Sequence, residues 1–261
     1  MKEHSIDGLH VTDFEGNGQT LIFVHAFPLN SSMWKPQVDF FKNHFRVITY
    51  DTRGLGKSKS PDNQFTMESY ADDFLKIAEH LNLNEIIACG LSMGGYIIQR
   101  SYLKNPVLFK SLILADTKSE RDDNNGLISR ANVINMIKSG KRKNFIDDFI
   151  PKLINKNSFQ NSGLKNHLEE IISLNADDGI CGAQLALATR IHSTDFLPSF
   201  NLPVLILVGE DDILTPLPCS QTMNSFITGS ILKIIPSSGH LSNIENPERF
   251  NEEILNFVRR I

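Results

Sequence analysis

Hydrophobic residues along the chain follow two patterns, short unbroken runs and apolar positions at helical intervals. The runs predict strands buried on both faces, because such strands need apolar side chains on either side. They cover residues 20–25, 45–50, 86–91, 111–115, 204–208 and 231–235. Helical spacing lies between most of them, so the chain is expected to form an α/β fold with a mostly parallel sheet flanked by helices.

Turn and cap residues mark several boundaries of these elements. Residues 3–14 are expected to form a hairpin that turns at Asp7-Gly8. Capping side chains predict where three helices start. The expected caps are Thr66 (with Ser69 as the alternative) for residues 66–81, Asn246 before Pro247 for the last helix, and Ser31 or Ser32 for a helix containing Trp34.

The alternation of strands and helices stops between residues 117 and 197. That stretch has no strand run and shows helical patterns over residues 127–137, 145–154 and 164–174. An all-helical insertion between two strands of a sheet is typical of a lid over a pocket. We therefore expect a core of residues 1–117 and 197–261, with residues 118–196 as an inserted helical lid.

Composition limits the class of protein more than it specifies the function. The 261 residues, 41% hydrophobic and 21% charged, suit one globular domain with an insertion, and a net charge of −4 gives no basis for nucleic-acid binding. No apolar run is long enough for a membrane span, and the first residues lack the apolar region of a signal peptide. The three cysteines are widely spaced, so a cytoplasmic location without a disulfide framework is expected.

One motif suggests a nucleotide site that the surrounding residues do not support. Gly56-Lys57-Ser58 follows a predicted strand and resembles the end of a phosphate-binding loop. That loop requires a glycine five residues earlier, where this chain has Asp51. We therefore do not expect nucleotide binding here.

A second motif places a serine between a strand and a helix. Ser92 lies in a Gly-x-Ser-x-Gly sequence from Gly90 to Gly94, after the strand expected at residues 86–91 and before a helix that begins at Met93. A glycine-rich turn without function would explain the five residues alone. The flanking strand and helix favour a nucleophile elbow, whose strained turn raises the serine hydroxyl above the sheet edge. Such a serine requires a base, an acid and hydrogen-bond donors for an oxyanion.

The candidate base and acid come from the ends of later strands. His240 follows the last predicted strand and precedes the C-terminal helix, so we expect it at the same sheet edge as Ser92. Gly239 would allow its loop to fold close to the site. The acid should follow the preceding strand, where the residues alone do not decide among three carboxylates. The candidates are Glu210, Asp211 and Asp212, with Asp116 at the end of the earlier strand as a weaker competitor.

Taken together, these segments resemble the α/β-hydrolases, and most closely the 3-oxoadipate enol-lactonase group. The similar segments span almost the whole chain. They are residues 25–29, 51–56, 90–95, 209–216 and 239–247, with a weaker likeness at residues 182–186 in the lid. These motifs are specific for the fold and the catalytic triad and are poor guides to the substrate.

The resemblance implies roles for particular residues. In that family the fourth residue of the Gly-x-x-Asp segment is the acid, which corresponds to Asp212. The family's His-Gly-x loop supplies one oxyanion donor from the backbone of its third residue, here Phe27, together with the N–H of Met93. Ala26 stands where the family usually has glycine. His25 is expected to brace this loop without transferring protons.

The expected function is hydrolysis of a small carboxylic ester or lactone through an acyl-enzyme, with Ser92, Asp212 and His240 as the triad. No metal or cofactor is implied, and the partner is a small-molecule substrate. Perhydrolysis, thioester cleavage or C–C bond hydrolysis on the same triad are alternatives, as is a small-molecule receptor with a slow triad.

The pocket is expected to be mostly apolar, with Trp34 as readily a core residue as a substrate contact. Arg121, Arg130 and Arg190 are available near the lid for a substrate with carboxylates. The expected pocket residues are Phe27, Trp34, Met93, Ile213, Leu214 and Leu241.

Overall fold

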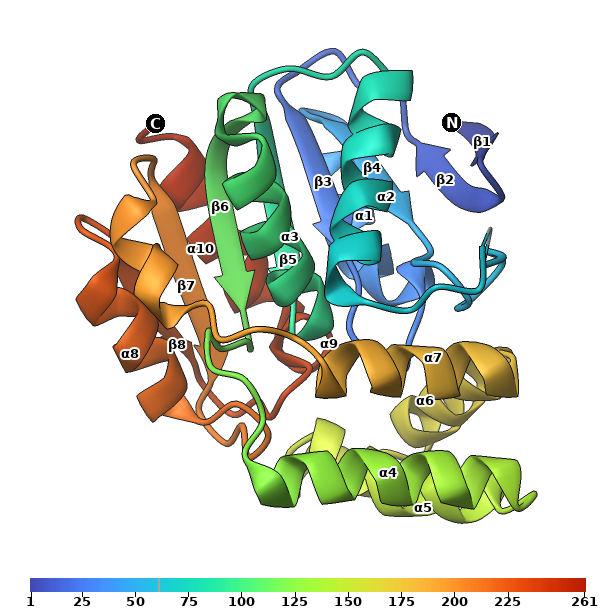
Figure 1. The fold of residues 1–261 in the computed structure, drawn as a ribbon. Helices are drawn as coiled ribbons and strands as arrows, with labels where there is room; N and C mark the ends of the chain where they lie inside the picture. The colour runs from blue at the N-terminus through green and yellow to red at the C-terminus, as the bar shows by residue number, and fades with distance from the viewer. Residues whose placement is uncertain (61) are drawn as a thin grey trace.

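The protein is built on one eight-stranded sheet (Figure 1), in a computed structural model that describes residues 1–60 and 62–261. Its strands are Lys2–Ile6 (β1), Leu9–Asp13 (β2), Thr20–Val24 (β3), Arg46–Tyr50 (β4), Ile86–Leu91 (β5), Phe109–Ala115 (β6), Val204–Gly209 (β7) and Ile231–Ile235 (β8). Their order across the sheet is β1-β2-β4-β3-β5-β6-β7-β8. β1 pairs antiparallel with β2 and β2 with β4, whereas the pairs from β4 across to β8 are parallel. This confirms the predicted mostly parallel sheet.

Helices cover both faces of this sheet. The central strands β5 and β7 are buried along their whole length, as their unbroken apolar sequences predict. Met67–His80 (α2) and Met93–Lys104 (α3) pack together on one face, in front in Figure 1. Lys35–Phe41 (α1) contacts Pro247–Val258 (α10) behind the sheet, and Leu217–Phe226 (α8) follows β7. A short helix, Ser242–Glu245 (α9), precedes α10.

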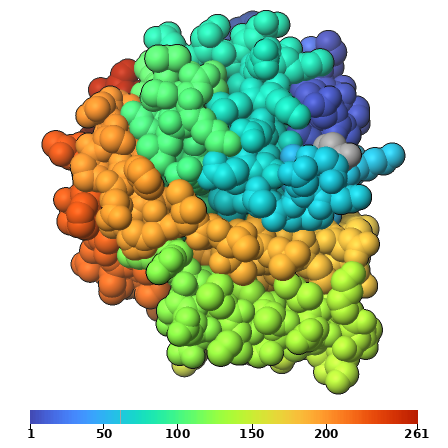
Figure 2. Space-filling view, viewed as in Figure 1, coloured from blue at the N-terminus to red at the C-terminus, as the bar shows by residue number. Residues whose placement is uncertain are grey.

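Four helices lie between β6 and β7 in the chain, and we call them the helical layer. They are Asn124–Lys138 (α4), Arg142–Leu153 (α5), Ser162–Ser173 (α6) and Asp177–Ala188 (α7). The arrowheads of β3 and β6 point toward this layer, which therefore lies at the carboxyl ends of the parallel strands (Figure 1). In the space-filling view the gold residues of α7 lie against the core, and the yellow-green residues of the layer lie beyond them (Figure 2). The three helices expected from the sequence in this region are confirmed.

Most predicted boundaries are confirmed, and one is wrong. β1 and β2 form the hairpin across Asp7, and the Thr66 and Asn246 side chains accept hydrogen bonds at the starts of α2 and α10. Neither Ser31 nor Ser32 caps the helix near Trp34. Instead, the Oδ1 atom of Asn30 accepts a hydrogen bond from the Ser32 N–H (3.0 Å) at the start of a 3₁₀ turn, and α1 begins after it.

Helix α7 was not expected as a helix, because glycine lowers helix propensity. The structure shows why glycines are needed there. A β-carbon at Gly179 would lie 1.7 Å from the Gly54 carbonyl oxygen, and one at Gly182 would lie 2.3 Å from the Phe65 ring. The packing of α7 against the core loop at Gly54 therefore selects residues that disfavour the helix locally. Helices α8 and α9 also went unpredicted.

Candidate active site

Ser92 occupies a strained turn at the junction of β5 and α3. Its backbone φ of 55° lies in the left-handed region, which is costly for a residue other than glycine. A β-carbon at Gly90 would lie 2.3 Å from the Gly94 carbonyl oxygen, and one at Gly94 would lie 2.1 Å from the Val24 carbonyl oxygen. Both positions therefore require glycine. The Ser92 N–H donates to the Ala115 carbonyl oxygen (2.9 Å), which fixes the turn against the end of β6.

His240 and Asp212 form a buried hydrogen-bonded pair. The Nδ1 atom of His240 lies 2.9 Å from the Oδ2 atom of Asp212, and His240 is only 2% exposed. Asp212 also accepts hydrogen bonds from the Leu214 N–H (2.8 Å), the Thr215 N–H (3.1 Å) and the Thr215 hydroxyl (2.6 Å). Because Nδ1 faces a carboxylate, the proton of a neutral imidazole sits on Nδ1 and leaves Nε2 as the acceptor.

These partners decide the charge of Asp212. Burial alone raises the pKa of the carboxyl, but the attraction of His240 and the hydrogen bonds from His240 and Thr215 outweigh it and lower the pKa to about 2. Asp212 is therefore a carboxylate at every pH near neutrality. A buried, ionised acid is the partner that an imidazole needs in order to take up a second proton.

Of the four candidate acids, only Asp212 is hydrogen-bonded to His240 in the described residues. Glu210 and Asp211 are exposed, and the Glu210 carboxylate accepts from the Ser237 N–H (2.9 Å). Asp116 is fully buried and accepts from the Gly209 N–H (2.7 Å) and from the Ser242 hydroxyl. Asp116, the weaker candidate for the acid, thus contacts the segment that carries Asp212 and the segment that carries His240, and it makes no hydrogen bond to the His240 imidazole in the described residues.

His25 holds the loop that contains Phe27. Its Nε2 atom accepts from the Thr52 N–H (2.9 Å), and its Nδ1 atom lies 2.9 Å from the Ala26 carbonyl oxygen. Burial lowers the pKa of His25, so the ring is neutral and Nδ1 donates to Ala26. The expected bracing contact is present.

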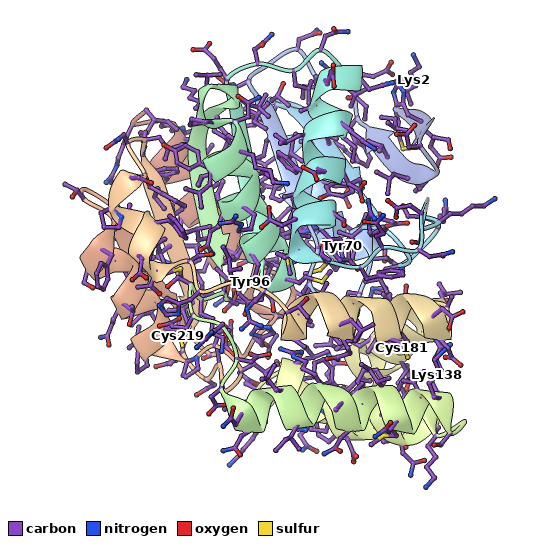
Figure 3. All side chains as sticks on the ribbon, viewed as in Figure 1. Lys2, Tyr70, Tyr96, Lys138, Cys181 and Cys219 are labelled. Atoms are coloured by element: carbon purple, nitrogen blue, oxygen red, sulfur yellow. The ribbon has the colours of Figure 1, made fainter. Side chains whose placement is uncertain are left out.

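Ser92 and His240 line the same cavity, of about 120 Å³, which we call the Ser92 cavity. Phe27, predicted as an oxyanion donor, also lines it. Tyr96 lies at the end of α3 that faces the helical layer (Figure 3). The other lining residues are Tyr96, Lys118, Asp122, Arg130, Phe149, Leu187, Leu214 and Thr215.

The residues predicted to form the pocket lie in different places relative to this cavity. Leu214 lines the Ser92 cavity. Trp34 does not, because it is fully buried in the core, with its ring 4.8 Å from that of Phe23. Ile213 is 67% exposed and lines a different cavity with Asp211. Leu241 is fully buried, does not line the Ser92 cavity, and its N–H donates to the Leu153 carbonyl oxygen (3.0 Å). The side chain of Met93 is also buried, so its predicted role concerns its backbone N–H alone.

The expectation of a mostly apolar pocket is wrong. Lys118, Asp122 and Arg130 line the Ser92 cavity, and the Arg190 guanidinium lies behind it, 4.5 Å from the centre of the Tyr96 ring. Arg121, by contrast, is exposed. Lys118 and Asp122 follow β6 closely in the sequence, so the end of a strand beside the elbow was the signal that could have identified them.

Size alone does not locate the active site. A cavity of about 570 Å³ lies along β2 and the start of α1, and its lining includes none of the residues predicted to act with Ser92. In residues 1–60 and 62–261 no three His, Cys, Asp or Glu side chains are grouped closely enough to hold a metal ion. Over the same residues, no helix combines the length and apolarity that crossing a membrane requires.

Comparison with known proteins decides the family. The family model described as alpha/beta hydrolase fold matches residues 19–247. The chain belongs to the α/β-hydrolase fold family. Among curated relatives, it is 29% identical to 3-oxoadipate enol-lactonase 1 of Acinetobacter baylyi, over 94% of this chain and 90% of that protein.

Solved structures agree with this membership of the α/β-hydrolase family. An esterase from Thermogutta terrifontis, described with malate bound, is 32% identical with a TM-score of 0.94, over 100% of this chain and 99% of that one. The enol-lactonase from Burkholderia xenovorans LB400 has a TM-score of 0.90 at 20% identity, over 99% and 100% of the chains, and shows the shared fold. The predicted resemblance is confirmed, as is the enzyme class: these α/β-hydrolases are carboxylic ester hydrolases.

Proposed function

We propose that this α/β-hydrolase cleaves a small carboxylic ester or lactone through an acyl-enzyme formed on Ser92. The observation that carries the proposal is the buried Asp212–His240 pair, which opens onto the same cavity as the strained Ser92 turn. Nucleophile, base and orienting acid come from the ends of β5, the β8–α9 loop and the end of β7. These roles require side chains held in fixed positions, and each of these segments is anchored by backbone hydrogen bonds.

In the first step His240 Nε2 takes the proton of the Ser92 hydroxyl while its oxygen attacks the carbonyl carbon of the substrate. Asp212 holds Nδ1–H and stabilises the imidazolium that forms. The tetrahedral intermediate then expels the alkoxide, which leaves with the proton from His240. In the second step His240 activates a water that attacks the acyl-enzyme and releases the carboxylic acid.

The backbone N–H groups of Phe27 and Met93 are proposed to bind the oxyanion. In the described part of the chain, neither N–H donates to a protein acceptor, although both residues are buried. A buried donor without a partner is costly unless something else binds it. Each such donor is worth roughly 3 kcal/mol in the transition state, by comparison with other oxyanion holes.

The charges around the Ser92 cavity support a substrate that carries an anionic group beside its ester. Arg130 Nε lies 3.0 Å and Lys118 Nζ 3.7 Å from the Asp122 carboxylate, whose other neighbour is the Arg190 guanidinium at 2.8 Å. Asp122 and Glu120, the latter close to Arg190, bring two negative charges against the three positive ones, so the group keeps a net positive charge. A carboxylate on the substrate would supply the missing charge and accept charge-assisted hydrogen bonds. Malate, described in the Thermogutta terrifontis esterase, is such an anion.

The size of the cavity supports a small substrate. Its volume of about 120 Å³ is below the roughly 300 to 1,000 Å³ of pockets for drug-sized ligands. A second cavity of about 320 Å³, the outer cavity, lies among the helices of the helical layer and shares Arg130, Phe149 and Leu214 with the first. We propose that residues 118–196 act as a lid, since their helices supply Arg130 and Phe149 to the lining of both cavities.

Hydrolysis of p-nitrophenyl esters from acetate to laurate by the wild type and by Ser92→Ala tests this function. We expect the wild type to turn over the short esters, and its turnover should fall once the acyl chain of the ester is too long for the Ser92 cavity. Turnover should be lost in Ser92→Ala. Equal turnover by the two proteins would overturn the proposal. Perhydrolysis, thioester cleavage, C–C bond hydrolysis and the receptor function stay predictions.

A further inference from the structure

Asp116 is a buried carboxyl group that the proposed reaction does not use. It follows β6 directly, is fully buried, and has a backbone φ of 43° in the left-handed region. Its N–H donates to the Leu207 carbonyl oxygen (2.9 Å), which continues the pairing of β6 with β7. A buried carboxyl at the edge of the sheet beside Ser92 requires an explanation, because burying such a group is costly.

Its two oxygens connect the two segments that carry the base and the acid. Oδ1 accepts from the Gly209 N–H (2.7 Å), at the end of β7 and three residues before Asp212. Oδ2 is hydrogen-bonded to the hydroxyl of Ser242, the first residue of α9 and two residues after His240. One carboxyl group therefore bridges the segment of the acid and the segment of the base.

The same two segments touch through their backbones next to this bridge. A β-carbon at Gly209 would lie 2.0 Å from the Gly239 carbonyl oxygen, so β7 and the loop of His240 are in direct contact. The Asp211 N–H donates to the Ser238 carbonyl oxygen (2.8 Å). Asp116 thus lies between the end of β7 and the loop of His240, where a small shift of either segment would change the position of His240 relative to Ser92.

The charges near Asp116 favour its neutral form. Burial and the nearby Asp212 carboxylate raise the pKa of Asp116 well above its ordinary value, with Glu245 adding to the effect. No Lys or Arg in the described chain pairs with it. A neutral carboxyl can hold both segments without placing a second negative charge beside the imidazole.

We propose that Asp116 is a positioning residue, which ties the end of β7 to the start of α9 and so fixes His240 relative to Asp212 and Ser92. The proposal rests on the proposed function of the triad. It differs from the role of the acid, because Asp116 acts through hydrogen bonds to Gly209 and Ser242 and makes no contact with His240. A misplacement of about 1 Å at such a site can lower the rate by on the order of 100-fold.

The test compares Asp116→Asn, Asp116→Ala and Ile113→Val, a buried residue of β6 used as a stability control. An asparagine can accept from the Gly209 N–H and donate to the Ser242 hydroxyl, so kcat should stay within about threefold of the wild type with an unchanged pH profile. Asp116→Ala should lower kcat at least tenfold with little change in KM. Ile113→Val should keep the wild-type kcat. The downfield NMR signal of the His240 Nδ1 proton should persist in Asp116→Asn and move in Asp116→Ala.

Several outcomes would overturn the proposal. One is a wild-type kcat in folded Asp116→Ala, and another is a loss of kcat in Ile113→Val as large as that in Asp116→Ala. A third is a loss of kcat in Asp116→Asn as large as that in Asp212→Asn, which would mean that Asp116 acts as an ionised acid. If Asp116→Ala does not fold, Ser242→Ala removes one arm of the bridge, and an unchanged kcat there would contradict the proposal. Undiminished activity of Ser92→Ala would instead refute the proposed function, whatever Asp116 does.

Discussion

Two regions meet at the Ser92 cavity, the edge of the sheet and the helical layer, and they hold their side chains differently. At the sheet edge, Ser92, Asp212 and His240 lie within five residues of the ends of β5, β7 and β8, in segments fixed by backbone hydrogen bonds and by glycines that admit no β-carbon. In the helical layer, Arg130 and Phe149 project from α4 and α5 and are held by other side chains. We therefore propose that the sheet edge supplies the reacting groups for every substrate, whereas the helical layer determines which substrates are preferred.

The largest expected effect comes from the sheet edge. Ser92→Ala should lower kcat by roughly 10⁴- to 10⁶-fold, because the nucleophile is lost while the oxyanion donors remain. The loss should be the same for every ester, anionic or neutral, measured under saturating substrate. A loss confined to one class of ester would contradict the division between the two regions.

Asp212→Asn should lower kcat on the order of 10⁴-fold, because the amide cannot stabilise the imidazolium and favours the wrong tautomer of His240. Asp211→Asn is the matched control, since its exposed carboxylate precedes Asp212 in the same loop. We expect its kcat to stay within about twofold of the wild type. If Asp211→Asn were the damaging change, the assignment of the acid would be wrong.

Arg130→Met tests the helical layer. Removing a charge-assisted hydrogen bond worth about 1.5 to 3 kcal/mol should lower kcat/KM at least tenfold for p-nitrophenyl hemisuccinate and less than threefold for the neutral butyrate. Lys138→Met is the control on the same helix. Its ammonium pairs with Asp178 (2.6 Å) at the end of α4 far from Tyr96 (Figure 3). Equal losses on both esters would show that Arg130 supports structure and does not select the substrate.

The smallest effect concerns stability. Burial raises the pKa of Asp122, but Arg190 and Arg130 outweigh it and lower the pKa from 3.8 to about 2. A depressed carboxyl pKa stabilises the folded state above the unfolded pKa, and this stabilisation is lost as the pH falls from about 4 toward 2. Asp122→Asn should therefore lower the free energy of unfolding by about 2 kcal/mol at pH 7 and by progressively less below pH 4. Urea unfolding at several pH values measures this difference, and a gap independent of pH would contradict it.

The sequence predicts the sheet edge well because its residues are constrained locally. The turn at Ser92 needs glycine at positions 90 and 94 whatever packs around it, and His240 and Asp212 each follow a strand whose apolar run is visible in the sequence. The choice of Asp212 among the neighbouring carboxylates came from the family resemblance. In the structure Asp212 lies within hydrogen-bond distance of His240, and its role as the acid stays a proposal.

The helical layer was predicted less well because its contacts join residues far apart in the sequence. Asp122 meets Arg190 across 68 positions, and Arg130 meets Gln184 across 54, so no local pattern shows that these two arginines lie beside the residues that follow β6. Trp34 and Leu241 are among the apolar residues expected in the pocket, with core packing as the alternative for Trp34, and both are buried in the core. Nearness in the sequence does not show which way a side chain points.

The most direct test of the central claim is the intact mass of the protein after reaction with a fluorophosphonate, followed by peptide mapping. We predict one adduct, located on Ser92, which forms in the wild type and is absent from Ser92→Ala. Its formation should be slowed in Asp212→Asn, because His240 must accept the serine proton. An adduct on another residue, or an unchanged adduct in Ser92→Ala, would contradict the assignment of Ser92 as the nucleophile.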